Sequence, residues 1–348
     1  MEQTTLFDLS ELRPRLSGRR FLLVHGPFYD SLGLGPFFDS LDAVHFTGFT
    51  PNPLYEQVEE GVRCFLQNGC RAIVAVGGGS AMDVAKCVKL FCRMDPAVNY
   101  LHQEKRDTGV PLYALPTTAG TGSEATRHAV IYYQGEKQSV SHPSIVPDAA
   151  VLLPEMLRSL PLYQKKCTLL DALCQAIESW WSRSATEESA KHSRRAITGI
   201  REHWQAYIQA GDSDAARQIL LAANEAGKAI NITATTAPHA MSYKLTSLYH
   251  LPHGHAVALC MAQVWPYTRD HAGADARLQG VLAELEGLGG YGWFMELMDS
   301  LEMAAPVAQD REAEMALLTA SVNPIRLQNH PIPLEAETLR ALYEKIVQ

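Results

Sequence analysis

Four residues in the second half of the sequence are suited to binding a divalent metal ion. Asp171 and Gln175 lie four positions apart in a segment with helical periodicity, so both side chains would project from one face of a helix. His239 and His253 follow, and Pro252 argues against one unbroken helix between them. A carboxylate, an amide oxygen and two imidazoles could hold a divalent cation and leave a position open for substrate. The chain has 13 histidines, and an ordinary structural role for these two remains the alternative.

A glycine-rich segment in the first half is suited to binding a phosphate group. Residues 77–80 read Gly-Gly-Gly-Ser, and they follow a β-type apolar run and precede a helical one. Glycines allow a ligand to approach the backbone closely, and a helix N-terminus offers unpaired N–H groups to an anion. The segment is not the GxGxxG fingerprint, so an ordinary Rossmann dehydrogenase is not indicated. The alternative is a tight turn with Ser80 as N-cap and Asp83 as its capping-box partner.

A second polar loop covers residues 116–124, with the sequence PTTAGTGSE, and also follows an apolar run. Hydroxyl groups and glycines at the carboxyl end of a parallel strand suit contacts with ribose and phosphate. A solvated loop without a ligand is the alternative.

The elements that must position these residues change in character near residue 154. Before it, β-rich runs alternate in part with helical stretches, which predicts a parallel sheet covered on both faces. The predicted strands cover residues 21–24, 72–76, 112–115, 129–132 and 150–153, and the helices residues 55–66 and 81–91. After it, helical patterns dominate, notably over residues 213–230, 276–285 and 333–346. We therefore expect an α/β nucleotide-binding domain over residues 1–154 and an all-α domain over residues 155–348.

Composition narrows the class of protein further. At roughly 150 residues per domain, a chain of 348 residues has about two domains. It is 47% hydrophobic, which excludes disorder as its main state, and its net charge of −8 argues against a nucleic-acid or membrane-surface protein. Seven cysteines without a CxxC pair, and no visible secretory signal, favour reduced thiols and a cytoplasmic location.

Together these segments resemble the iron-containing (group III) alcohol dehydrogenase family, within the dehydroquinate synthase-like superfamily. The resemblance runs from about Phe21 to the last helix. It is carried by GGGSAMDVAK, PTTAGTGSEAT, DALCQAIES and Pro252-His253-Gly254, with Pro51-Asn52-Pro53, Lys137 and Pro147-Asp148. It implies a nucleotide-binding α/β domain, a helical domain, a cleft that holds NAD(P) and a metal, and a homodimer or larger assembly.

The resemblance also implies roles for single residues. The implied metal ligands are Asp171, Gln175, His239 and His253. The implied dinucleotide contacts are Gly78, Gly79 and Ser80 for the pyrophosphate, Asp83 and Lys137 toward the nicotinamide, and Thr117 and Thr118 on the adenosine side.

Three departures from the family pattern affect the expected chemistry. Gln175 stands where the family usually has His, which leaves the metal open between Fe²⁺ and Zn²⁺. Gly26 stands where NAD-preferring members have Asp, so repulsion of a 2′-phosphate is lost and NADPH is favoured, with NADH as the alternative. Tyr243 and Lys244 stand where many members have a second His followed by Pro, and this pattern resembles the phosphonoacetaldehyde reductase branch.

We therefore expect NADPH-dependent, metal-assisted reduction of a small anionic aldehyde, with phosphonoacetaldehyde as the leading substrate. Lys244 would bind the anion. Further anion contacts could come from Arg127, His128, His142 and Arg183, and the proton from Tyr243 or His255. The alternatives are an alcohol dehydrogenase or aldehyde reductase for neutral substrates, a polyol-phosphate dehydrogenase, and a non-catalytic nucleotide-binding protein if Gln175 has abolished the metal site.

Overall fold

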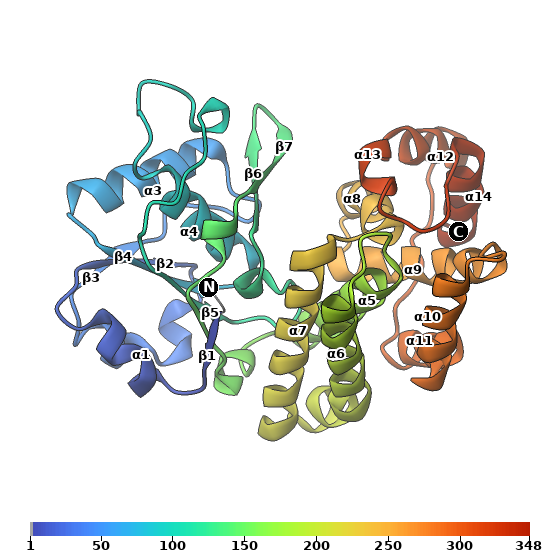
Figure 1. Cartoon of the computed structure of the whole chain (residues 1–348), viewed down its shortest axis with the longest axis horizontal. Coiled ribbons are helices and arrows are strands. Elements are labelled where there is room, and N and C mark those ends of the chain that lie inside the picture. The colour runs from blue at the N-terminus through green and yellow to red at the C-terminus, as the bar shows by residue number, and fades with distance from the viewer. Residues whose placement is uncertain (1–2) are drawn as a thin grey trace. The chain divides into compact units, whose positions relative to one another are not determined.

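The chain forms two compact units, which are described separately here. The structure is a computed structural model and describes residues 3–348. The first unit runs to Leu160 and includes residues 211–220, whereas the second comprises residues 161–210 and 221–348. Figure 1 shows strands in the first part of the chain and helices in the rest. The predicted fold class, an α/β nucleotide-binding-type part followed by a helical part, is confirmed.

A six-stranded parallel sheet forms the centre of the first unit, with the strand order β1-β8-β5-β4-β2-β3. Its strands are β1 (Thr4–Leu6), β2 (Phe21–His25), β3 (Ala43–Phe46), β4 (Ala72–Gly77), β5 (Leu112–Pro116) and β8 (Ala149–Val151). The central strands β2, β4 and β5 coincide with predicted runs. Because both faces of the sheet are covered, these runs are apolar throughout instead of alternating.

One predicted strand lies outside this sheet. Residues 129–132 belong to β6 (His128–Tyr133), which pairs antiparallel with β7 (Glu136–Ser141). Gln134 and Gly135 connect the two strands, and both have positive φ angles, of 52° and 79°. Such a two-residue turn matches the right-handed twist of a hairpin. The sequence prediction missed β7 because its residues are mostly polar.

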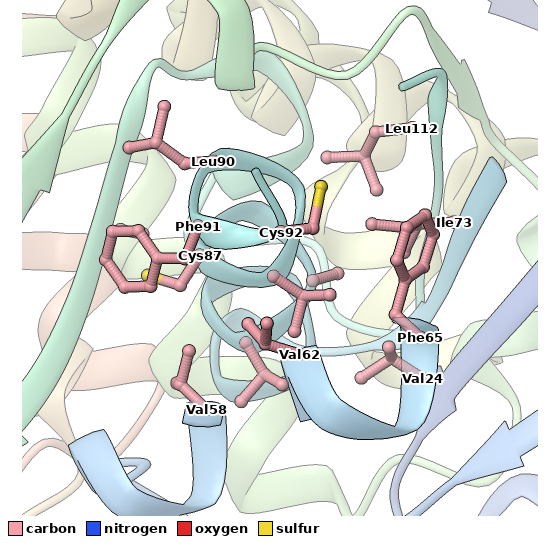
Figure 2. Packing of buried hydrophobic residues seen from close by; sticks show 14 of the residues in the cluster. Val24, Val58, Val62, Phe65, Ile73, Cys87, Leu90, Phe91, Cys92 and Leu112 are labelled. Carbon is pink, nitrogen blue, oxygen red and sulfur yellow. The ribbon is translucent and has the colours of Figure 1, made fainter. Parts of the chain in front are cut away.

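Helices cover the two faces of the sheet with separate apolar clusters. Helices α3 (Tyr55–Gln67) and α4 (Gly79–Phe91) pack on one face. Figure 2 shows Val58, Val62 and Phe65 of α3 in one apolar cluster with Phe91 of α4. Helices α1 (Leu9–Leu16) and α2 (Gly35–Phe38) cover the other face. Removing one buried aromatic side chain from such a core costs about 3–5 kcal/mol, so these clusters fix the position of α4.

The second unit is helical. Its helices are α5 (Leu162–Trp181), α6 (Glu187–Gln205), most of α7 (Ser213–Thr233), α8 (Ala237–Tyr249), α9 (His253–Asp270), α10 (Ala276–Gly287), α11 (Gly290–Ser300), α12 (Arg311–Ala320), α13 (Pro324–Leu327) and α14 (Ala336–Ile346). The predicted break before His253 is present: α8 ends at Tyr249, and His250 adopts a left-handed conformation with φ 54°. Helix α14 begins three residues later than predicted, because its N-cap, Glu335, still has extended backbone.

The seven cysteines are free thiols, and six of them are buried. Within residues 3–348, no helix has the length and apolar character needed to span a membrane.

Candidate metal and nucleotide sites

Three of the four predicted metal ligands lie together in the second unit. Asp171 projects from α5, His239 from the first turn of α8, and His253 is the first residue of α9. One ligand atom from each lies within 4.8 Å of the other two. Asp171 Oδ1 is 3.2 Å from His239 Nε2 and 4.0 Å from His253 Nε2. The side chains of Asp171 and His239 are 5% and 6% exposed, but that of His253 is 38% exposed, so the cluster is accessible beside His253.

The fourth predicted ligand, Gln175, is buried one helical turn after Asp171. Its side chain hydrogen-bonds with the Asp171 carboxylate. Two imidazoles and one carboxylate, with an amide beside them, form a donor set that fits a divalent ion such as Fe²⁺ or Zn²⁺. The residues present therefore fit the metal that the motif implies.

A buried carboxylate that sequence reasoning had not singled out holds His239 in place. Glu178 is fully buried on α5, and its Oε2 pairs with Nδ1 of His239. Its Oε1 accepts hydrogen bonds from the backbone and hydroxyl of Thr236, at 2.8 and 2.9 Å, and from the backbone N–H of His239. With Nδ1 engaged, Nε2 is the nitrogen that points at Asp171. A partner of this kind fixes the orientation of a ligating imidazole.

The carboxylates also determine the electrostatics of the cluster. Burial by itself would raise the pKa of Asp171, but the hydrogen bond from His239 and the nearby His253 hold that pKa below its usual value. Burial would likewise lower the pKa of His239, but Glu178 and Asp171 raise it to about 9. Two buried carboxylates thus create a negative environment that favours a cation.

A glycine allows α9 to approach α5 closely enough for His253 to reach Asp171. A Cβ atom on Gly254 would lie 1.9 Å from the backbone oxygen of Cys167 and 3.0 Å from Cβ of Asp171. Pro252 precedes α9 as its N-cap, so the helix begins at His253. The Pro-His-Gly order therefore starts the helix, supplies the ligand and permits the close approach.

Tyr243 lies beside the cluster, whereas His255 does not join it. The Tyr243 ring is stacked on the His253 ring, with centroids 5.8 Å apart. Its hydroxyl accepts a 2.9 Å hydrogen bond from Nη1 of Arg326. His255 is buried two residues after His253, and residues at this helical spacing do not face the same side. Its Nδ1 is 2.7 Å from the Tyr163 hydroxyl, and burial lowers its pKa.

The phosphate-binding segment lies in the first unit, between β4 and α4. Gly78 is the N-cap of α4, and among the described residues no side chain caps this end of the helix. The alternative in which Ser80 caps the helix is therefore wrong. The Ser80 hydroxyl instead accepts a hydrogen bond from the backbone N–H of Asn52. At Gly77, a Cβ atom would lie only 2.7 Å from Cβ of Ala81. The turn requires glycine and leaves the first N–H groups of α4 suited to an anion.

The second polar loop packs against the first. The backbone N–H of Thr117 donates to Gly77 at 3.0 Å, and a Cβ on Gly78 would meet Cγ2 of Thr118 at 3.3 Å. The parallel pairing of β4 with β5 brings these loops together.

A buried lysine ties the same loop to α4. Lys86 Nζ donates to Oγ of Ser123 at 3.0 Å, to Oγ1 of Thr126 at 3.1 Å and to the backbone oxygen of His128 at 2.8 Å. Burial lowers the pKa of Lys86 to about 8, while Asp83 opposes that shift. Burial raises the pKa of Asp83 to about 6, against the attraction of Lys86 and, more weakly, of Lys137. Lys86 lies in the quoted GGGSAMDVAK motif, but the sequence alone gave it no role.

Gly26 follows directly after the end of β2. A Cβ on Gly26 would meet no atom within 4 Å, so no carboxylate or bulky group crowds that position. Beside it, Nε2 of His25 lies 2.9 Å from Nδ1 of His45, and burial lowers the pKa of His25.

The candidate anion contacts are dispersed. Arg127 and His128 lie half-buried in the first unit, where the backbone oxygen of Arg127 accepts from His142. The His142 ring accepts a hydrogen bond from the backbone N–H of Ser144. In the second unit, Arg183 donates hydrogen bonds to the backbone oxygens of Asn329 and Pro331. Lys244 lies half-buried on α8, five residues after His239. At about 100° per residue, its side chain points about 140° away from that of His239.

An α/β unit with a phosphate-type loop and a helical unit with a two-histidine, one-carboxylate cluster are the arrangement expected of a metal-dependent, dinucleotide-binding oxidoreductase. Comparison with known protein families supports this expectation. Residues 1–154 match the model "Iron-containing alcohol dehydrogenase", and residues 166–347 match "Fe-containing alcohol dehydrogenase family, C-terminal". The chain belongs to the iron-containing alcohol dehydrogenase family. The predicted family is confirmed by these two matches.

Three individual proteins are similar to this chain. A phosphonoacetaldehyde reductase of Streptomyces viridochromogenes is 36% identical over 214 residues, which cover 56% of this chain and 52% of that protein. A lactaldehyde reductase of Escherichia coli is 30% identical, over 69% of this chain and 65% of that protein. Among solved structures, the sulfoacetaldehyde reductase of Bifidobacterium kashiwanohense in complex with NAD⁺ is 25% identical, with a TM-score of 0.88 over 99% of this chain and 96% of that one. The chain thus spans about half to two thirds of the curated relatives named here.

Proposed function

We propose that this protein reduces a small anionic aldehyde to the primary alcohol with NADPH, and that phosphonoacetaldehyde, yielding 2-hydroxyethylphosphonate, is its substrate. One observation carries the proposal. The phosphonoacetaldehyde reductase and the sulfoacetaldehyde reductase are named for two-carbon aldehydes that carry an anionic head group. Phosphonate and sulfonate differ in charge but share tetrahedral oxygens that an arginine or lysine can bind.

The chain's own residues supply the positioning for this chemistry. When bound, the metal ion supplies a Lewis acid for the aldehyde oxygen and the dinucleotide supplies the hydride. Asp171, His239 and His253 would hold the metal, with Gln175 beside them and Glu178 orienting His239. The phosphate loop and the N-terminus of α4 would hold the pyrophosphate.

Tyr243 is the better placed of the two predicted proton donors. Its hydroxyl accepts a hydrogen bond from Arg326, and its ring contacts the candidate ligand His253. His255 lies on another side of α9 and is buried. We propose that Tyr243 delivers the proton to the alkoxide oxygen and that His255 has a structural role with Tyr163.

The proposal is tested by following NADPH and NADH oxidation by the full chain across a panel of aldehydes. Metal-stripped protein would be reloaded separately with Fe²⁺ and Zn²⁺. We expect kcat/KM to be highest for phosphonoacetaldehyde with NADPH, and activity to disappear in the chelated enzyme and in Asp171→Ala. Gly26→Asp has room for its side chain, and its carboxylate would repel a 2′-phosphate, so the NADPH/NADH preference should fall by at least about tenfold. The uncharged Gly26→Asn is its matched control.

A neutral-aldehyde reductase is the second candidate, because the lactaldehyde reductase aligns over a larger share of this chain than the phosphonate enzyme does. Preference for lactaldehyde or propionaldehyde over phosphonoacetaldehyde would support it and reject the proposed substrate. Faster oxidation of polyol phosphates than reduction of any aldehyde would indicate a polyol-phosphate dehydrogenase.

A further inference from the structure

We propose that Arg326, on α13, binds the anionic head group of the substrate beside the metal cluster. This inference rests on the proposed function, because it names the group that recognises the anion. It replaces Lys244, which the sequence had suggested for this role.

The contact between Arg326 and Tyr243 connects the arginine to the metal cluster. Nη1 of Arg326 donates to the Tyr243 hydroxyl at 2.9 Å, and its guanidinium carbon is 5.0 Å from the centre of that ring. The same ring lies nearly parallel to His253, with an interplanar angle of 6°. One aromatic side chain therefore contacts both a candidate metal ligand and the arginine. A two-carbon aldehyde is short, so its carbonyl and its head group need binding residues that are near neighbours, and Arg326 and His253 share Tyr243 as a neighbour.

The charge of Arg326 is not used elsewhere in the described part of the chain. Within residues 3–348 no carboxylate oxygen lies within 4.0 Å of its guanidinium, whereas other half-buried cations, such as Lys166 and Lys228, have acidic partners. Arg326 is itself half-buried. A partly desolvated guanidinium without a carboxylate has donors left for a bidentate contact with phosphonate or sulfonate oxygens.

The segment that carries Arg326 is anchored by hydrogen bonds on both sides of it. Asn323 caps α13 through the backbone N–H of Ile325, and Pro324 occupies the first turn. The Asn329 side chain accepts a hydrogen bond from the Ser182 hydroxyl. It donates hydrogen bonds to the backbone oxygens of Thr233 and Thr235. A binding arginine on an anchored segment loses less conformational entropy when it orders against a ligand.

Lys244 is less suited to this role. Tyr243, four residues after His239, lies on the face of α8 that carries the ligand, and Lys244 is turned away from it. A lysine also offers a point charge, which lacks the planar fork of arginine.

The test compares kcat/KM for phosphonoacetaldehyde with that for propionaldehyde, a small neutral aldehyde that lacks the anionic head group, in four forms of the metal-loaded enzyme. These are the wild type, Arg326→Ala, Arg326→Lys and Lys244→Ala. Arg269→Ala is the matched control, because Arg269 is exposed and paired with its neighbour Asp270. We expect Arg326→Ala to lose about 10- to 150-fold on phosphonoacetaldehyde, the loss of a charge-assisted contact, and less than about threefold on propionaldehyde. Arg326→Lys should recover part of the loss.

Methylphosphonate provides a second measurement that does not depend on turnover of an aldehyde. It should inhibit propionaldehyde reduction competitively in the wild type, and its inhibition constant should rise at least about tenfold in Arg326→Ala. Equal losses on both aldehydes, or a selective loss in Lys244→Ala instead, would overturn the assignment of Arg326. A wild type that prefers propionaldehyde would instead reject the proposed function, and the anion site with it. Circular dichroism and thermal melting identify a variant that fails to fold, in which case Arg326→Lys decides.

Discussion

Glu178 is the residue on which the geometry of the metal cluster depends most. It is completely buried, and its two oxygens contact the ring and the backbone of His239 together with Thr236. Loss of such a supporting carboxylate typically lowers metal affinity by about 10- to 100-fold. We therefore expect Glu178→Gln to bind Zn²⁺ about 10- to 100-fold more weakly than the wild type in calorimetric titrations of the metal-free protein.

Glu225 offers a matched control for Glu178. It also pairs with a histidine ring, at 2.8 Å from Nδ1 of His192, but it is not part of the cluster. Glu225→Gln should therefore leave Zn²⁺ affinity unchanged. Equal affinity in wild type and Glu178→Gln would show that the Glu178–His239 pair contributes only to packing.

Part of this cluster was predictable at the level of single residues. Asp171, His239 and His253 follow from motifs, and the structure brings them together. Glu178 could have been found as well, because positions 171, 175 and 178 follow the i, i+4, i+7 spacing of one helical face. Arg326 could not, because it is 83 residues from Tyr243 and only the packing of α13 beside α8 brings the two together.

At the scale of elements, the close approach of α9 to α5 positions His253 opposite Asp171. A methyl group at Gly254 would overlap the backbone oxygen of Cys167, which cannot move without shifting α5. We expect Gly254→Ala to lower the free energy of unfolding by at least about 1–3 kcal/mol, as overpacking does, and to weaken Zn²⁺ binding. Urea unfolding and metal titration measure the two effects.

Gly280, inside α10, is the control for this prediction. A Cβ there would meet no atom within 4 Å, and alanine is the better helix former by about 0.5–1 kcal/mol. Gly280→Ala should therefore stabilise the protein and leave metal binding unchanged. If Gly254→Ala behaved in the same way, the helices would have room that the structure does not show.

The sequence predicted an element well where the element's own apolar residues determine it. It predicted an element poorly where the conformation depends on pairing with another strand. The apolar runs that became β2, β4 and β5 are continuous because both sides of the sheet are buried. Strand β7 is mostly polar, and its conformation depends on pairing with β6, which no local pattern in its own residues reveals. The sequence also offers Ser80 as an alternative N-cap of α4, because serine is a common capping residue, and the structure shows that Gly78 takes that position.

At the scale of the whole molecule, the candidate functions are divided between the two units. The residues suited to the dinucleotide lie in the first unit, and the metal cluster lies in the second. The change in sequence pattern near residue 154 and the order of the family motifs predict that these two groups of residues belong to different parts of the chain. The net charge of −8 gave no information about the local cations. Lys86 makes buried contacts and Arg326 makes a half-buried one, and an average charge does not describe such local contacts.

This division predicts that each ligand protects its own unit against hydrogen exchange. A ligand that binds only the folded state stabilises it by about 2.7 kcal/mol at one hundred times its Kd, which slows exchange through unfolding about 100-fold. In exchange followed by mass spectrometry, Zn²⁺ added to the metal-free protein should protect peptides of α5, α8 and α9, which carry Asp171, His239 and His253. NADP⁺ alone should protect residues 77–86 and the loop that carries Thr117 and Thr118. Asp171→Ala should lose the first protection and keep the second. Unchanged exchange around residues 171, 239 and 253 with saturating Zn²⁺ and Fe²⁺ would show that these residues do not bind the metal.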